Sequence, residues 1–167
     1  TLSYLDYGGE SRNTLMMLHG HMNDARTYSE LASKRQGWRI ISLDQRGHGW
    51  SEHSPDKDYS RESYVKDIFH LIRQELGGQS VTILGHSLGG INAYQFAARY
   101  PALIRAVIVE DIGVEITADM SFAENLPKHS NSLHELRESL KRAGLKAIDY
   151  FSESVFEDEQ GWGFRSD

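Results

Sequence analysis

The stretch 81–90 constrains the fold more than any other part of this chain. Apolar and β-branched residues at 81–84 run into Gly-His-Ser-Leu-Gly, and a helical pattern over 91–100 follows at once. A strand, a tight turn and a helix in that order, with G-x-S-x-G in the turn, hold a serine hydroxyl outside the sheet. The pattern predicts Ser87 as a nucleophile.

The residue types around Ser87 fit that chemistry. Side chains at Gly85 and Gly89 would clash with neighbouring backbone in so tight a turn. The first N–H groups of the following helix point at the serine and favour negative charge there, so the N–H of Leu88 is a candidate donor to an oxyanion. The alternative is a glycine-rich turn that only connects two elements.

Strand and helix patterns alternate before and after this turn. Apolar runs predict strands over 2–7, 14–18, 38–43 and 104–109, and helical spacing predicts helices over 24–36, from Ser60 to about 76, and over 91–100. This alternation indicates an α/β fold with a mostly parallel sheet flanked by helices. In the loop after 38–43 we interpret Asp44, Arg46 and His48 as structural, because charged groups packed in a loop usually satisfy backbone groups.

An acidic pair follows the last of these strands. Glu110 and Asp111 lie at the carboxyl end of a strand that we expect beside the nucleophile strand, where a carboxylate can orient a histidine. A solvated acidic turn explains the pair equally well on the residues alone.

The pattern changes near residue 115. We predict an α/β core over 1–114 and a partial helical cap over 115–167. Within the cap, Ser132 and Glu135 form a capping box that opens one helix, a second helix covers 145–156, and no further strand follows. Short amphipathic helices inserted after a sheet are typical of a lid over a site.

Composition narrows the function classes. The chain has 167 residues, a net charge of −6 and no cysteine. An acidic balance without a basic stripe argues against nucleic acid as a partner, and no apolar run reaches the roughly 20 residues needed to cross a bilayer. Disulfides, thiolate metal sites and a cysteine nucleophile are excluded. With no leader visible, we expect a cytoplasmic protein with no membrane contact, no metal and no cofactor.

The motifs together resemble the α/β-hydrolase superfamily, and most closely its small bacterial esterases. The motifs are His19-Gly20, the run from Asp44 to Ser51, the serine turn and Val-Glu-Asp-Ile at 109–112. The resemblance implies hydrolysis of a small-molecule ester, with an acyl-enzyme formed on Ser87 and an oxyanion held by the backbone N–H groups of His21 and Leu88. It favours Asp111 over Glu110 as the acid, although other branches of the family place the acid one strand later, in a strand that this chain does not have. The family usually has an apolar residue where His21 stands.

The same resemblance exposes a gap. The family's catalytic histidine follows the last strand, in the order Ser, acid, His. Only His129 and His134 come after Asp111, both in the predicted cap, so we assign no catalytic histidine in this chain. We therefore expect an incomplete enzyme that lacks the last strands of the fold. The strand 104–109 would then be an unpaired apolar edge that associates with a second chain or a swapped copy.

Two other functions stay open on the sequence. One is a non-catalytic binding module built on a truncated hydrolase core. The other is a related hydrolase of lactones, thioesters or C–C bonds that uses the same nucleophile.

Overall fold

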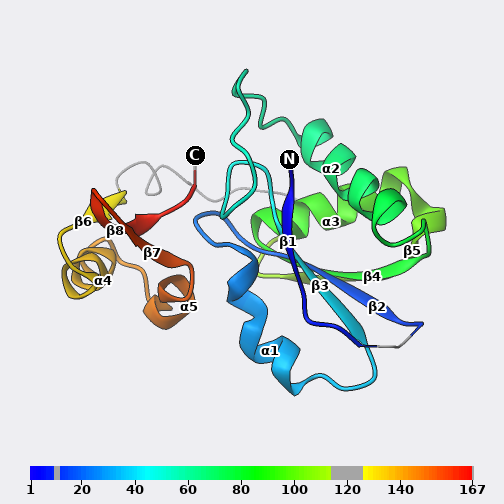
Figure 1. Ribbon diagram of the computed structural model, residues 1–167, viewed down its shortest axis with the longest axis horizontal. Helices are drawn as coiled ribbons and strands as arrows, with labels where there is room; N and C mark the ends of the chain where they lie inside the picture. Colours follow the sequence, from blue (N-terminus) through cyan, green and yellow to red (C-terminus); the bar gives the residue numbers. More distant parts are fainter. Residues whose placement is uncertain (10–11, 114–125, 167) are drawn as a thin grey trace.

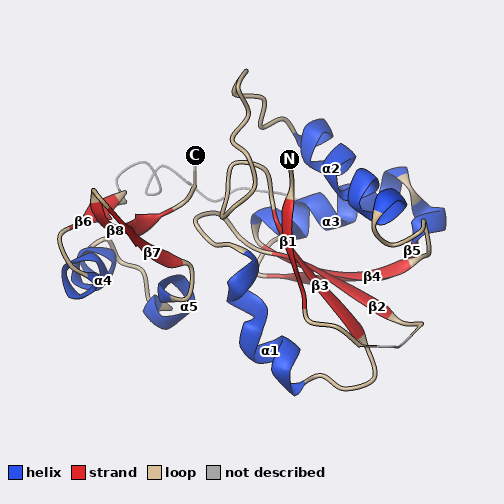
Figure 2. Cartoon of the chain, in the orientation of Figure 1, coloured by secondary structure: helices blue, strands red, loops and turns tan. Residues whose placement is uncertain are grey.

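A computed structural model describes residues 1–9, 12–113 and 126–166 of the chain. Figures 1 and 2 show strands and helices that alternate up to residue 110, followed by a smaller unit. The strands are β1 (Ser3–Asp6), β2 (Thr14–Leu18), β3 (Arg39–Asp44), β4 (Val81–His86), β5 (Ile104–Glu110), β6 (His129–Ser130), β7 (Val155–Asp158) and β8 (Gly161–Phe164). The α-helices are α1 (Ser29–Lys34), α2 (Arg61–Gln74), α3 (Leu88–Arg99), α4 (Leu133–Arg142) and α5 (Ile148–Ser152), and the short 3-10 helices are η1 (Ala25–Tyr28) and η2 (Pro101–Leu103).

Within the described residues, five strands form the main sheet in the order β1-β3-β2-β4-β5. β1 is antiparallel to β3, and the other neighbours are parallel. This confirms the predicted fold class, and the strands lie within two residues of their predicted ends. Because the carboxyl ends of parallel strands lie at one edge of a sheet, the loops after β2, β3, β4 and β5 gather there.

Helices cover both faces of this sheet. Met16 and Leu18 of β2 pack into a core with α2 and α3, whereas Leu15 and Met17 pack with η1 and α1 on the opposite face. Figure 1 shows α1 on one side of the sheet and α2 and α3 on the other. All five residues of β2 are buried, which explains its unbroken apolar run.

The smaller unit, residues 126–166, has its own core. Ser132 caps α4 by accepting a hydrogen bond from the backbone N–H of Glu135, as the capping box predicts. Three antiparallel strands in the order β6-β8-β7 pack with α4 and α5. Their buried residues are Leu136, Leu140, Ile148, Val155 and Phe164, joined by Met22 from the loop after β2.

The predicted second helix over 145–156 and the predicted absence of further strands are wrong. Helix α5 spans only Ile148–Ser152, and the chain then enters a β7-β8 hairpin. The spacing of Ile148, Phe151 and Val155 suits a helix, but Val155 pairs with Phe164 across the hairpin. Strand β8 also lies close to the start of β6, because a Cβ on Gly163 would stand 2.3 Å from the carbonyl oxygen of Lys128. The boundary predicted near residue 114 lies outside the described residues, and the division into core and cap stays a prediction.

Buried Ser154 ties the smaller unit to the core. Its hydroxyl accepts hydrogen bonds from the side-chain amide of Asn23 (3.3 Å) and the backbone N–H of Asp24 (3.0 Å), and it lies 3.1 Å from the hydroxyl of Thr27. These partners all belong to the loop after β2 and the helix η1. The loop is thereby held by the smaller unit on one side and by the sheet on the other.

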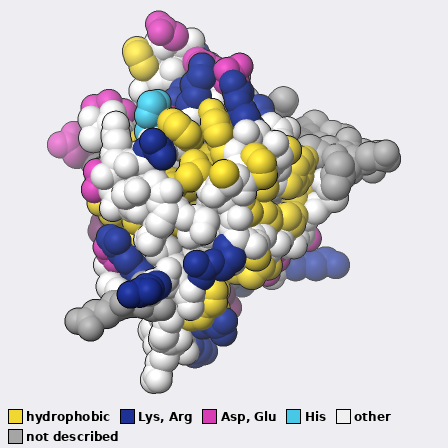
Figure 3. Space-filling view, turned by 90° about the vertical axis from the view of Figure 1, so that its right-hand side faces the viewer, with side chains coloured by type: hydrophobic (Ala, Val, Ile, Leu, Met, Phe, Trp, Pro, Cys, Tyr) yellow, Lys and Arg dark blue, Asp and Glu magenta, His cyan; other side chains and the backbone are white. Residues whose placement is uncertain are grey.

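Strand β5 lies at one end of the sheet order. Ile108 and Val109 on this strand are 49% and 40% exposed. Figure 3 shows apolar side chains gathered on the side of the molecule where β5 lies. Such an edge offers unpaired backbone groups and apolar surface to another strand. Within the described part of the chain, no helix has the length and apolar character that a membrane span requires.

Candidate active site

Ser87 occupies the sharp turn between β4 and α3. Its backbone has φ 49° and ψ −112°, a left-handed φ that costs a non-glycine residue of order 1–3 kcal/mol. A Cβ on Gly85 would lie 2.3 Å from the carbonyl oxygen of Gly89, and a Cβ on Gly89 would lie 2.1 Å from that of Leu18. The predicted strand, turn and helix are confirmed, and so is the need for glycine at positions 85 and 89.

The loop after β2 lies directly against this turn. A Cβ on Gly20 would stand 2.6 Å from Nδ1 of His86 and 3.5 Å from Cβ of Ser87. His21 follows as an exposed residue, and Met22 has φ 68° while its side chain is buried in the core of the smaller unit. The structure thus places His21 in the loop that faces Ser87, and Leu88 at the N-terminus of α3.

Two histidines in these loops are buried and neutral. The ring of His19 donates from Nδ1 to the carbonyl oxygen of Gly20 (2.8 Å) and accepts at Nε2 from the backbone N–H of Gln45 (3.0 Å). Burial lowers the pKa of His19 to about 4 and the pKa of His48 to about 3. Their ring centroids lie 5.1 Å apart. Both rings act as packing and hydrogen-bonding groups that shape the loops.

The other residues interpreted as structural also bind within the fold. The carboxylate of Asp44 accepts hydrogen bonds from the backbone N–H groups of Ala25 (2.7 Å) and Trp50 (3.1 Å). The guanidinium of Arg46 donates two hydrogen bonds to the carboxylate of Asp67, at 2.7 and 2.9 Å. These contacts agree with a structural interpretation of both side chains.

Asp111 comes close to the serine turn through the neighbouring histidine. The carbonyl oxygen of Glu110 accepts a hydrogen bond from the backbone N–H of Ser87 (2.9 Å), so the end of β5 lies against the turn. Asp111 has φ 56°, and its carboxylate is 81% exposed and lies 3.5 Å from Nε2 of His86. The structure therefore puts the predicted acid beside His86.

Tyr150 is a residue of this site that the sequence did not reveal. It comes from α5, and its hydroxyl lies 2.7 Å from Nδ1 of His86. Burial raises the pKa of this hydroxyl, so it stays protonated. Since the carboxylate of Asp111 favours a proton on Nε2 of His86, Nδ1 is the acceptor and Tyr150 the donor. The smaller unit thus reaches the serine turn directly.

Comparison with known proteins agrees with this geometry. The family model described as the alpha/beta hydrolase fold matches residues 13–149. The chain belongs to the α/β-hydrolase family. Among solved structures, a marine microorganism esterase superposes with a TM-score of 0.80 at 24% identity, covering 99% of this chain and 68% of that one. An α/β hydrolase from Novosphingobium aromaticivorans superposes with a TM-score of 0.83 at 23% identity, covering 99% of this chain and 64% of that one.

Curated relatives match in sequence over the same region. The 2-(acetamidomethylene)succinate hydrolase of Mesorhizobium japonicum is 35% identical over 98 residues, which are 58% of this chain and 34% of that protein. The sn-1-specific diacylglycerol lipase ABHD11 of Danio rerio is 32% identical over 121 residues, which are 70% of this chain and 37% of that protein. The matched part of this α/β hydrolase thus spans about a third of the length of these relatives.

The two histidines that follow Asp111 in this chain lie away from the serine turn. Nε2 of His129 lies 3.7 Å from the carboxylate of Asp158 in the small sheet, and the ring packs against Phe156. His134 is exposed on α4. Neither is assigned as a base for Ser87.

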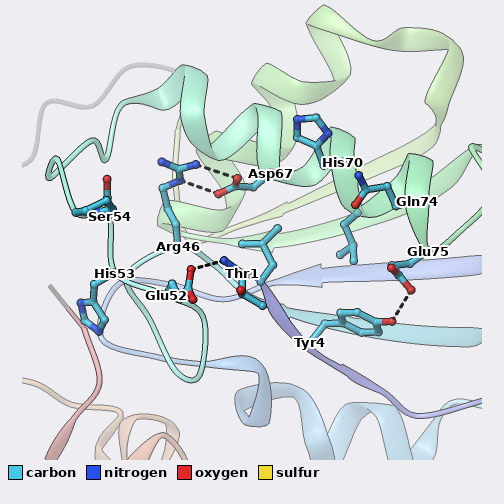
Figure 4. A pocket seen from close by; sticks show the side chains of 13 residues that line it. Thr1, Tyr4, Arg46, Glu52, His53, Ser54, Asp67, His70, Gln74 and Glu75 are labelled. Atoms are coloured by element: carbon cyan, nitrogen blue, oxygen red, sulfur yellow. Dashed lines mark hydrogen bonds and ion pairs between the residues drawn. The ribbon is translucent and has the colours of Figure 1, made fainter.

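A surface cavity of this chain is separate from the serine turn. It has a volume of about 510 Å³ and lies between β1, α2 and the loop after β3 (Figure 4). Arg46 and Asp67 form an ion pair in its wall, and the hydroxyl of Tyr4 donates to Glu75 (3.0 Å). None of the four predicted site residues lines it, so the cavity is not part of the candidate active site.

Proposed function

We propose that this α/β hydrolase is a serine hydrolase that cleaves carboxylic esters through an acyl-enzyme on Ser87. The observation that carries the proposal is the left-handed backbone of Ser87 with the loop after β2 packed against it. Such a turn presents a hydroxyl to a substrate carbonyl, and the loop and the start of α3 supply backbone donors.

In this proposal the backbone N–H groups of His21 and Leu88 stabilise the tetrahedral oxyanion. The oxygen of Ser87 bonds to the carbonyl carbon, the alcohol leaves with a proton, and water then releases the acid from the acyl-enzyme. Asp111 is the acid that orients a histidine, which the described residues do not supply. Activity of the 167-residue chain by itself is therefore expected to be weak, because the oxyanion donors and substrate binding would supply most of it.

The test is covalent labelling with a fluorophosphonate probe. We expect slow labelling of the chain at Ser87, located by peptide mass spectrometry, and no labelling at that position in Ser87→Ala. Equal labelling of the two proteins would contradict the proposal. A folded chain that reacts neither alone nor when supplied with the C-terminal region of a relative would favour a non-catalytic binding module instead.

We also propose that β5 pairs with a strand of a second copy of this chain. Ile108 and Val109 expose apolar surface along that edge. By light scattering, we expect the purified chain to be larger than a monomer and Ile108→Lys to restore the monomer, because a charge on an edge strand opposes pairing. The matched control is Leu31→Lys, which adds the same charge at a 40% exposed residue of α1. A monodisperse monomer before any substitution would rule the pairing out.

A further inference from the structure

Gln45, in the loop after β3, makes three contacts that the proposed reaction does not explain. It is 1% exposed. Its backbone N–H donates to Nε2 of His19 (3.0 Å), and its side-chain amide nitrogen donates to the carbonyl oxygen of the same residue (2.6 Å). One residue thus holds both the ring and the backbone of the first residue after β2.

The other end of the Gln45 amide binds the nucleophile helix. Its oxygen accepts a hydrogen bond from the side-chain amide nitrogen of Asn92 (2.6 Å), which is fully buried on α3. The amide oxygen of Asn92 in turn accepts from the guanidinium of Arg61 at the start of α2 (2.6 Å). Arg61, Asn92, Gln45 and His19 thus form a relay of hydrogen bonds. Because the guanidinium of Arg61 can only donate, it sets the direction of each hydrogen bond in the relay.

The relay joins the two segments that carry the proposed oxyanion donors. Asn92 lies one helical turn after Leu88 on α3, and His19 lies two residues before His21. Asp44, the residue before Gln45, accepts the backbone N–H of Ala25 at the far end of the same loop. The loop over 19–25 is therefore fastened at both ends by consecutive residues, and Asn92 ties that fastening to the helix of Ser87.

We propose that Gln45 and Asn92 are positioning residues that fix the distance between the N–H groups of His21 and Leu88. The inference rests on the proposed function, because it assigns a purpose to the spacing of two oxyanion donors. Oxyanion donors act only when they lie near 3 Å from the charge they stabilise, so a small displacement of the loop is costly. A buried relay of amides can fix this distance, because a buried polar network is rigid only when each of its groups has its hydrogen-bond partner.

Asn92→Asp tests the relay with little change in volume. The aspartate still accepts from Arg61 but cannot donate to Gln45. The oxygen of the Gln45 amide then faces a carboxylate oxygen, or the amide turns over and directs its oxygen at the carbonyl oxygen of His19. Both outcomes break the tie between the loop and α3. Gln45→Glu is the second variant, because a carboxylate accepts from Asn92 but cannot donate to His19. The matched control is Gln95→Glu, which adds the same charge to α3 at a half-buried position outside the relay.

The first measurement is the kinetics of fluorophosphonate labelling at Ser87. We expect Asn92→Asp and Gln45→Glu to lower the maximal labelling rate about 100-fold, the scale of losing one oxyanion donor, with the probe concentration at half-maximal rate nearly unchanged. We expect Gln95→Glu to label like the unsubstituted chain. A variant that only weakens the fold would instead lower the amount of protein that can be labelled, without lowering the maximal labelling rate of the folded fraction.

The second measurement is amide hydrogen exchange over residues 19–22, which needs no reaction at Ser87. We expect faster exchange there in both relay variants, with α2 protected as before. If the unsubstituted chain labels neither alone nor with the C-terminal region of a relative, the proposed function falls while the exchange result still decides the relay. Unchanged exchange over 19–22, or unchanged labelling in a chain that does react, would overturn the inference.

Discussion

Lowering the pH from 7 to 5 is expected to cost this protein about 4 kcal/mol of unfolding free energy through His19 and His48. Both rings are at most 2% exposed, and burial lowers their pKa values to about 4 and about 3. An unfolded histidine has a pKa near 6.5, so below that value the unfolded chain binds protons that the folded chain does not. Each histidine then contributes a loss of about 2 kcal/mol by pH 5. The loss continues until the pH passes the folded pKa values.

Urea unfolding followed by circular dichroism at pH 7, 6 and 5 measures this loss. Carboxylates have ordinary pKa values near 4 and titrate mainly below this range. Burial raises the pKa of Asp44, so protonation of this carboxylate offsets part of the loss. His48→Phe, which keeps a ring in the site, should reduce the pH dependence by about half, or about 2 kcal/mol. His70→Gln is the control, because it removes a histidine that is exposed on α2 instead of buried. An equal free energy of unfolding at pH 7 and pH 5 would contradict the prediction, because it would mean that folding does not lower the pKa values of the two buried rings.

The main sheet was predictable because each of its strands carries a local signal. Strand β2 is buried on both faces, and only a continuous apolar run satisfies that position. The turn at Ser87 was equally visible, since two glycines mark where backbone lies within 2.3 Å of a Cβ position. The placement of the loop over 19–22 beside Ser87 follows from parallel strands that end at one edge.

The small sheet was not predictable from local spacing. Ile148, Phe151 and Val155 share helical spacing, yet only the first two lie in α5, and Val155 pairs with Phe164 of β8. Strand β8 also pairs with β6, which lies before α4 and α5 in the chain. Strand pairing across such separations depends on how the whole unit packs. The capping box at Ser132 was predicted correctly because its signal lies within four residues of sequence. The hairpin was missed because its signal does not.

The contacts that organise the candidate site lie beyond any sequence pattern. Tyr150 reaches His86 across 64 positions, and Asn92 reaches Gln45 across 47. Neither pair has a characteristic spacing, because each depends on how two separate elements dock. The choice between Glu110 and Asp111 was open for a related reason. Adjacent carboxylates look alike in sequence, and only the fold directs the backbone of one to Ser87 and the side chain of the other toward His86.

Gly89→Ala is expected to destabilise the fold by at least about 3 kcal/mol, the upper end of what overpacking a well-packed core costs. Gly89 lies in the first turn of α3, and helix propensity alone would make alanine better there by up to about 1 kcal/mol. The clash reverses that sign. The new Cβ would lie 2.1 Å from the carbonyl oxygen and 2.5 Å from the carbonyl carbon of Leu18. Both atoms are backbone at the end of β2, where Leu18 pairs with Gly85 of β4, so neither can move without disturbing the sheet that holds Ser87.

Thermal unfolding of Gly89→Ala against Gln95→Ala separates the two effects. Gln95 lies on the same helix at a half-buried position, so its replacement changes helix propensity without inserting an atom between α3 and β2. We expect the Gln95 variant to stay within about 0.5 kcal/mol of the unsubstituted chain. A Gly89 variant as stable as the Gln95 variant would mean that the start of α3 can move away from β2. The tight contact between α3 and the strand that leads into the loop over 19–22 would then be absent in solution, and with it the geometry on which the proposed oxyanion site at Ser87 depends.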